Sequence, residues 1–199
     1  MTHPLLPTLK AARVVPVIRT ASTAHAATAV AWLRDAGISV FEITMSVPDA
    51  PALIADLARE PALLVGAGTV ASVADAEACL KAGAKFLVAP WVGAEIVAPA
   101  HEAGAAVMPT EVRAALAAGT DVVKVFPASS AGGPGHIRAL KSVFPNVPFC
   151  PTGGVDPSNL RQWLDAGAAF VGIGGRLVDP KLIAAGDKAA VQAAARAAL

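Results

Sequence analysis

A lysine lies inside an otherwise apolar, β-branched run of the sequence. The run extends from Val122 to Phe126, with Lys124 at its centre and Pro127 directly after it. Short apolar runs of this kind are typical of buried strands in parallel sheets. Burial disfavours an ammonium ion, so we expect Lys124 to present an uncharged amine that can attack a carbonyl carbon. The alternative is a structural lysine that reaches the strand end or pairs with a buried carboxylate.

A glutamate occupies the same kind of position in a second apolar run, from Val40 to Ile43. If both strands direct these side chains into one pocket, Glu42 and Lys124 offset each other's cost of burial. The glutamate is then an acid/base group beside a nucleophile. The alternative is a buried ion pair with a purely structural role.

Both residues belong to a repeating pattern of strands and Ala-rich helices. Strand-like runs are predicted at 13–18, 38–43, 63–67, 85–89, 105–108, 121–126, 147–151 and 169–173. Eight βα units without a domain-sized break predict an α/β fold, a single (β/α)8 TIM barrel over residues 1–199 with a short N-terminal segment before the first strand. A last helix at about 180–198 is expected to cover the outside of the barrel.

The predicted strands end in residues that could bind a substrate, and in TIM barrels the catalytic groups come from these ends. Arg19 follows the first strand, and arginine suits a carboxylate or a phosphate. Residues 152–154 and 174–176 follow the last two strands, where glycines let backbone N–H groups approach a phosphate. The alternatives are tight turns without a ligand and, for Arg176, a solvated surface position.

Composition and charge exclude several classes of function. The net charge of +1 gives no overall field that would attract nucleic acid or an acidic membrane. No secretory leader opens the chain and no apolar stretch reaches about 18 residues, so we expect a soluble, cytoplasmic protein. The cysteines, Cys79 and Cys150, lack a paired spacing, and the four histidines lack a ligand spacing, so we expect neither a disulfide nor a metal.

With these residues assembled, the chain resembles a family of class I aldolases along essentially its whole length. The family includes the 2-keto-3-deoxy-6-phosphogluconate (KDPG), 4-hydroxy-2-oxoglutarate (KHG) and phosphogalactonate aldolases. The resemblance rests on segments that occur in this order and spacing: Glu42-Ile43-Thr44, Val47-Pro48-Asp49-Ala50, Val65-Gly66-Ala67-Gly68-Thr69-Val70, Val88-Ala89-Pro90, Lys124-Val125-Phe126-Pro127 and Phe149-Cys150-Pro151-Thr152-Gly153-Gly154-Val155.

The resemblance implies a role for most of these residues. Lys124 is expected to form a Schiff base with pyruvate, Glu42 to act as general acid/base, and Thr69 to contact the pyruvyl carboxylate. The resemblance also implies a homotrimer that needs neither cofactor nor metal. The residues expected to bind substrate are Arg19, Thr69, Pro90, Phe126, Thr152, Gly153, Gly154, Gly174, Gly175 and Arg176.

The sequence departs from the family pattern at three places. Ser46 stands where some members have a carboxylate-binding arginine, and Arg19 matches members that carry this arginine after the first strand. Gly175 replaces a serine that commonly contacts the phosphate, which leaves Arg176 to compensate. Pro109 is followed at once by Thr110, as if about five residues of the family's loop were absent, so this loop is either short or missing from the sequence.

We therefore expect a class I aldolase that cleaves KDPG, or a close 2-keto-4-hydroxy acid, to pyruvate and an aldehyde such as glyceraldehyde 3-phosphate. A KHG or phosphogalactonate aldolase is the alternative within the family. Two alternatives come from other classes: a phosphosugar isomerase, epimerase or synthase that uses Lys124 only as a charge, and a non-catalytic barrel that binds anions or serves as an assembly subunit.

Overall fold

The computed structural model describes residues 3–91 and 93–199. Every predicted strand is present, and the predicted bounds agree with the observed ones to within two residues. The strands are β1 Val14–Ile18, β2 Val40–Thr44, β3 Leu64–Gly68, β4 Phe86–Val88, β5 Ala106–Met108, β6 Val123–Val125, β7 Phe149–Pro151 and β8 Val171–Ile173. The helices are α1 Leu6–Ala12, α2 Thr23–Asp35, α3 Ala50–Leu57, α4 Val73–Lys81, the 3-10 helix η1 Ala94–Ile96, α5 Val97–Glu102, α6 Val112–Ala117, α7 Gly133–Val143, α8 Leu160–Asp165, α9 Pro180–Ala184 and α10 Lys188–Ala198.

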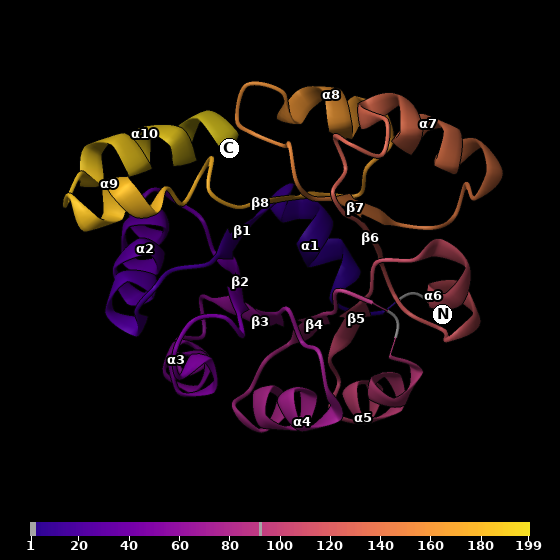
Figure 1. The fold of residues 1–199 in the computed structure, drawn as a ribbon, viewed down its shortest axis with the longest axis horizontal. Helices are drawn as coiled ribbons and strands as arrows, with labels where there is room; N and C mark the ends of the chain where they lie inside the picture. Colours follow the sequence, from indigo (N-terminus) through magenta and orange to yellow (C-terminus); the bar gives the residue numbers. More distant parts are fainter. Residues whose placement is uncertain (1–2, 92) are drawn as a thin grey trace.

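The strands run parallel around a common centre, with the helices outside them (Figure 1). Six strands form one curled sheet in the order β5-β4-β3-β2-β1-β8, and β6 pairs with β7 in a second sheet. The structure therefore shows an α/β fold with a six-stranded and a two-stranded sheet, in place of the predicted continuous eight-stranded sheet. Prolines at both seams, Pro109 after β5 and Pro151 in β7, lack the N–H group that a ladder needs.

A few backbone contacts connect the two sheets at these seams. The N–H group of Lys124 donates to the carbonyl of Pro109 over 2.9 Å. At the other seam the N–H group of Ala169 donates to the carbonyl of Phe149 over 2.9 Å, and an isolated parallel bridge pairs Thr152 with Gly172. The six-stranded and two-stranded sheets are thus hydrogen-bonded to each other at both sides.

Alternation along the strands determines which side chains face the helices and which face the centre. In β2 the residues on either side of Glu42 belong to the apolar core under the helices. In β6 the residues on either side of Lys124 belong to the same core. Glu42 and Lys124 therefore point the opposite way, toward the centre of the strands.

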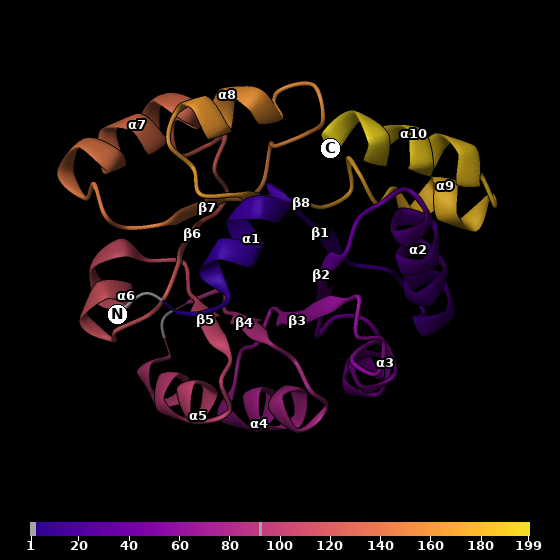
Figure 2. The same cartoon turned by 180° about the vertical axis from the view of Figure 1, so that it is seen from behind.

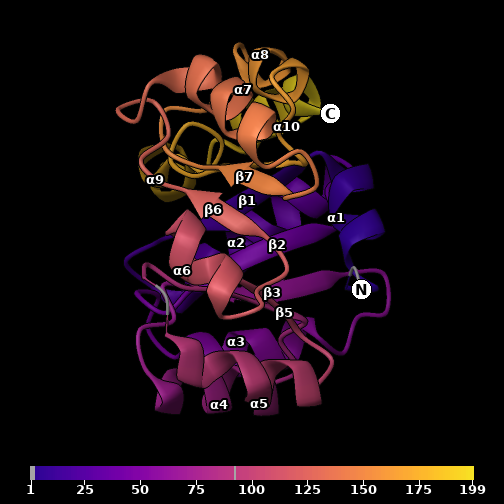
Figure 3. The same cartoon turned by 90° about the vertical axis from the view of Figure 1, so that its right-hand side faces the viewer.

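A second apolar cluster lies among the strands, and α1 covers it from one end. Leu6 and Leu9 of α1 are buried and pack with inward-facing residues such as Phe86, Met108 and Phe170. Figure 2 shows α1 lying across the circle of strands, and Figure 3 shows it at one end of them. The short segment predicted before the first strand contains the helix α1, which covers the end of the strands opposite the candidate site.

The C-terminal segment corrects one prediction. In place of a single helix at 180–198, α9 ends at Ala184 and α10 begins at Lys188. Gly186 between them has a φ of 73°, a conformation that favours glycine, and Asp187 caps α10 by accepting a hydrogen bond from the N–H group of Ala190. Among the described residues, no helix has both the length and the apolar character needed to cross a membrane.

Candidate active site

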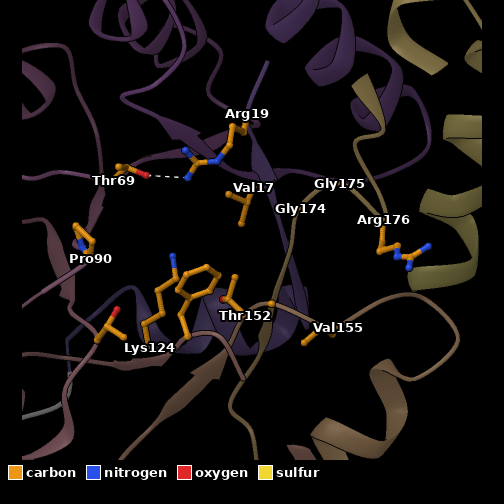
Figure 4. A pocket seen from close by; sticks show the side chains of 14 residues that line it. Val17, Arg19, Thr69, Pro90, Lys124, Thr152, Val155, Gly174, Gly175 and Arg176 are labelled. Atoms are coloured by element: carbon orange, nitrogen blue, oxygen red, sulfur yellow. Dashed lines mark hydrogen bonds between the residues drawn. The ribbon is translucent and has the colours of Figure 1, made fainter. Parts of the chain in front are cut away.

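A cavity of about 540 Å³ opens where the strands end, on the side away from α1. Each predicted site residue except Glu42 lines it. The lining residues are Val17, Arg19, Thr69, Pro90, Thr110, Lys124, Phe126, Thr152, Gly153, Gly154, Val155, Gly174, Gly175 and Arg176. Figure 4 shows the amine of Lys124 directed into this space, opposite Arg19 and Thr69. The volume is in the range of ordinary small-molecule sites.

Lys124 and Glu42 meet below this cavity. The Lys124 Nζ atom lies 3.7 Å from Oε1 of Glu42, and their side chains are 13% and 5% exposed. Both also line a small internal cavity, but of the two only Lys124 lines the large cavity as well. The carboxylate therefore lies deeper than the amine. Oε1 of Glu42 is buried and has no hydrogen-bond partner within the described residues. An unpartnered buried carboxylate oxygen is costly for stability, and such groups are found mainly where chemistry needs them.

A glycine makes room for this carboxylate. Gly68 at the end of β3 pairs with Thr44 on the neighbouring strand, one pleat beyond Glu42. A Cβ atom at Gly68 would lie 2.0 Å from Oε1 of Glu42, closer than any two such atoms can approach. The Glu42 carboxylate therefore occupies space that exists only because residue 68 has no side chain.

Arg19 is held in place by hydroxyl groups from two other segments. Its Nη1 atom donates to Oγ of Ser46 over 2.9 Å, and its Nη2 atom donates to Oγ1 of Thr69 over 2.9 Å. Oγ of Ser46 in turn lies 2.8 Å from Oγ1 of Thr44, which donates to the carbonyl of Ile18 over 2.9 Å. The guanidinium is thus fixed at the cavity, where it could bind a carboxylate.

Thr69 adopts a backbone conformation that its residue type disfavours. Its φ of 57° lies in the left-handed region, where a β-branched residue is an outlier. Strain of this kind costs on the order of 1–3 kcal/mol and persists mainly at functional sites. With this backbone conformation, Thr69 lines the cavity and its hydroxyl oxygen accepts a hydrogen bond from Arg19.

The turns after β7 and β8 form the other end of the cavity. Within the described part of the chain, the backbone N–H groups of Gly154, Gly175 and Arg176 have no acceptor. A Cβ atom added at Gly174 or Gly175 would meet no other atom within 4 Å. Free N–H groups around open space suit a phosphate or a carboxylate.

The side chain of Arg176 lies at the edge of this region. It is exposed, and in Figure 4 its guanidinium points away from Lys124. The pKa of Asp156 is lowered, chiefly by its hydrogen bond from Ser158, with a smaller contribution from the charge of Arg176. The predicted contact between Arg176 and a phosphate therefore requires this side chain to turn toward the cavity.

Three lining residues were not predicted from the sequence. The sequence gives no sign that Val17 and Val155 differ from other apolar core residues. They line the cavity because Val17 lies near the end of β1 and Val155 lies in the turn after β7. Thr110 lines the cavity and donates from Oγ1 to the carbonyl of Ala89 over 3.2 Å. It lies in the connection between β5 and α6, residues 109–111. Glu111 caps α6 by accepting hydrogen bonds from two backbone N–H groups.

The two cysteines are buried in the core. Cys150 is buried beside Lys124, and burial raises the pKa of its thiol to about 12. Cys79 is also buried, and the two cysteines are both free. Among the residues that the structure describes, no group of three or more His, Cys, Asp or Glu side chains could hold a metal ion.

Comparisons with known proteins identify the family of this chain. The sequence model of the aldolase family described as "KDPG and KHG aldolase" matches residues 6–194. The 2-dehydro-3-deoxy-6-phosphogalactonate aldolase of Escherichia coli (strain K12) is 36% identical over 173 residues, which cover 82% of this chain and 83% of that protein.

Two solved structures are similar over nearly the whole chain. The KDPG aldolase of Legionella pneumophila, with pyruvate captured as a covalent carbinolamine, is 29% identical, with a TM-score of 0.86 and 97% of both chains covered. The KDPG aldolase of Zymomonas mobilis ZM4, with 3-phosphoglycerate, is 31% identical, with a TM-score of 0.84, and covers 100% of this chain and 96% of that chain. A family match over most of the sequence and a relative above 30% identity together show that this chain belongs to the KDPG and KHG aldolase family.

Proposed function

We propose that this protein is a carbon–carbon lyase, a class I aldolase that cleaves a 2-keto-3-deoxy-4-hydroxy acid through a Schiff base on Lys124. The observation that carries the proposal is the placement of one largely buried amine, 13% exposed, at the inner end of a cavity and 3.7 Å from an unpartnered carboxylate oxygen. A structural ion pair does not explain this arrangement, because the carboxylate would then be expected to have its hydrogen bonds satisfied.

The geometry suits the following reaction. The lone pair of the Lys124 nitrogen attacks the C2 ketone, and the resulting carbinolamine loses water to give a protonated imine. Glu42 transfers protons during this step and then takes the proton from the C4 hydroxyl as the C3–C4 bond breaks. The electron pair of that bond moves into the iminium and forms an enamine. Protonation at C3 and hydrolysis release pyruvate and the free amine.

The two ends of the cavity suit the two ends of the substrate. Arg19 and Thr69 offer N–H and O–H groups to the C1 carboxylate, next to the carbon that Lys124 attacks. The turns that contain Gly154 and Gly175 offer free N–H groups to a distal phosphate. KDPG, which gives pyruvate and glyceraldehyde 3-phosphate, has anionic groups at both ends. The names of the similar proteins support KDPG or its galactonate counterpart as the substrate.

The larger organisation belongs to the same proposal. We treat residues 1–199 as one domain in which the two sheets act as a single (β/α)8 barrel, supported by the hydrogen bonds at both seams. A homotrimer in the cytoplasm is proposed on the family resemblance alone. Light scattering coupled to size-exclusion chromatography tests the trimer, and a monomer at micromolar concentration would contradict it.

Covalent trapping tests the reaction. Borohydride reduction in the presence of pyruvate is expected to add one reduced pyruvyl group to the protein, and peptide mass mapping should place it on Lys124. Lys124→Met should abolish both the adduct and turnover while leaving the circular dichroism spectrum unchanged. Lys85→Met, at an exposed lysine away from the cavity, is the matched control and should retain both. An adduct on another lysine, or a Lys124→Met variant with near-normal turnover, rules out the proposal.

A further inference from the structure

The hydrogen bonds around Arg19 have only one consistent direction. Oγ1 of Thr44 donates its proton to the carbonyl of Ile18, which leaves this oxygen as an acceptor toward Ser46. Ser46 must therefore donate to Thr44, and its own oxygen is free to accept from Nη1 of Arg19. The chain of donors runs from the Arg19 guanidinium through two hydroxyl groups to a backbone carbonyl between β1 and β2.

The same reasoning orients Thr69. Its oxygen accepts from Nη2 of Arg19, so its own proton is free to donate elsewhere, and the residue lines the cavity. Each terminal nitrogen of the guanidinium uses one of its two protons on a hydroxyl group and keeps the other. Arg19 and Thr69 thus present mainly donors, and a positive charge, to a ligand, which favours a carboxylate over a neutral group.

The side chain of Arg19 is exposed, so these hydroxyl groups are what restrict it. A free arginine samples many rotamers, and holding it in one arrangement before the ligand arrives lowers the entropy lost on binding. Thr69 keeps its hydroxyl on Arg19 in spite of a positive φ of 57°, which a glycine would adopt without strain. Both observations indicate that the position of the guanidinium matters.

We propose that Ser46, supported by Thr44, is a positioning residue that holds Arg19 ready for the substrate carboxylate and so selects 2-keto acids over uncharged ketones. This inference rests on the proposed aldolase function, because the ligand that Arg19 receives is the pyruvyl end of that substrate. Ser46 itself does not line the cavity and has no part in the bond-making steps.

Trapping with two ketones of nearly equal size tests the proposal. Pyruvate carries the carboxylate, and pyruvamide replaces it with a neutral amide. In Ser46→Ala the concentration of pyruvate that gives half-maximal borohydride trapping on Lys124 should rise about 5- to 20-fold, because a hydrogen bond to a charged group is lost. The value for pyruvamide and the maximal trapping rate should each change by less than about twofold. Ser46→Thr, which keeps a hydroxyl group, should retain most of the preference for pyruvate.

A double-mutant comparison separates positioning from a general effect on the fold. In an Arg19→Ala background the further change Ser46→Ala should have no additional effect on pyruvate, because the group that Ser46 holds is gone. Ser142→Ala on the exposed face of α7 is the matched control, since its hydroxyl bonds only the carbonyl of Ala139 in its own helix, and it should match the unmodified protein.

The outcomes distinguish this inference from the proposed function. Equal losses for pyruvate and pyruvamide in Ser46→Ala, or unchanged values for both, overturn the positioning role while the aldolase proposal stands. The same holds if Ser46→Ala still weakens pyruvate binding after Arg19 is removed. An unmodified protein that gives no adduct on Lys124 with pyruvate overturns the aldolase proposal itself.

Discussion

The residues that the sequence identifies most directly are the two buried charges. Lys124 and Glu42 each interrupt an apolar strand, which suggests that they could meet, and the structure adds that both face inward and lie 3.7 Å apart. The contribution of Gly68 could not be deduced in this way. A Cβ atom at residue 68 would collide with Glu42 only because of the rotamer that Glu42 adopts on the neighbouring strand. This rotamer is a feature of the three-dimensional packing. The hydrogen bond that Arg19 donates to Ser46 likewise joins residues 27 positions apart.

Gly68→Ala should greatly reduce turnover and leave the protein folded. The new methyl group would lie 2.0 Å from Oε1 of Glu42, so the carboxylate must move away from Lys124. Loss of a positioned acid/base group lowers kcat by about 100-fold or more, while the strain of one extra methyl group lowers the free energy of unfolding by about 1–3 kcal/mol. Steady-state kinetics and urea denaturation measure the two effects.

Two further variants make this test specific. Gly135→Ala in α7, where an added Cβ meets nothing within 4 Å, should leave kcat unchanged. In a Glu42→Ala background, which lacks the three Glu42 atoms that an added Cβ at residue 68 would meet, Gly68→Ala should cause little further loss of kcat. An equal loss of kcat in both backgrounds would mean that Gly68 acts through something other than the carboxylate.

At the scale of elements, short apolar runs located every strand, and glycines stand between several helices and the strands that follow them. The glycines at these positions have the positive φ values that a helix end requires, for example 103° at Gly37 and 95° at Gly83. The C-terminal helix was predicted as continuous because alanine, which dominates the segment, has the highest helix propensity and masks the break at Gly186. The sequence does not predict the separation of β6 and β7 from the other strands, because it depends on which neighbouring strands Pro109 and Pro151 face.

The break before α10 predicts a measurable capping effect. Asp187→Ala removes the side chain that accepts from the N–H group of Ala190 and should lower the free energy of unfolding by about 1 kcal/mol. Asp187→Asn keeps an acceptor and should lose much less. Asp165→Ala, which removes an exposed pair with Arg161, should cost no more than about 0.5 kcal/mol. Equal losses for the alanine and asparagine variants at 187, measured by urea denaturation, would exclude the cap.

At the scale of the whole molecule, the interior consists of two apolar clusters, one under the helices and one among the strands. Cys79 belongs to the first cluster and Cys150 to the second. Burial raises the pKa of Cys79 from 9.0 to about 11 and that of Cys150 from 9.0 to about 12. As the pH rises, the unfolded chain loses both thiol protons at a lower pH than the folded protein does. These thiols therefore lower the stability of the folded protein progressively above pH 9 and have no such effect below it.

The same values predict when the thiols become reactive. At pH 8 a disulfide reagent that attacks thiolates should label neither cysteine of the native protein over minutes, and both in denaturant. Because a single domain of this size is expected to unfold cooperatively, labelling of the two cysteines should rise together when the whole protein unfolds. Mass spectrometry after timed labelling along a urea gradient measures this. Rapid native labelling of Cys150 alone would show that the inner cluster opens independently.

The helix α1 has one more consequence for the proposed chemistry. Because α1 covers the strands at their starting end, we expect a substrate to reach Lys124 through the cavity at the opposite end, where the turns after β7 and β8 form one side of the opening. In the proposed orientation the half of the substrate nearer the opening becomes the aldehyde, which leaves first. Water then enters by the same path and hydrolyses the bond between pyruvate and the Lys124 nitrogen. Because both products use the same exit, the aldehyde is released first and pyruvate second.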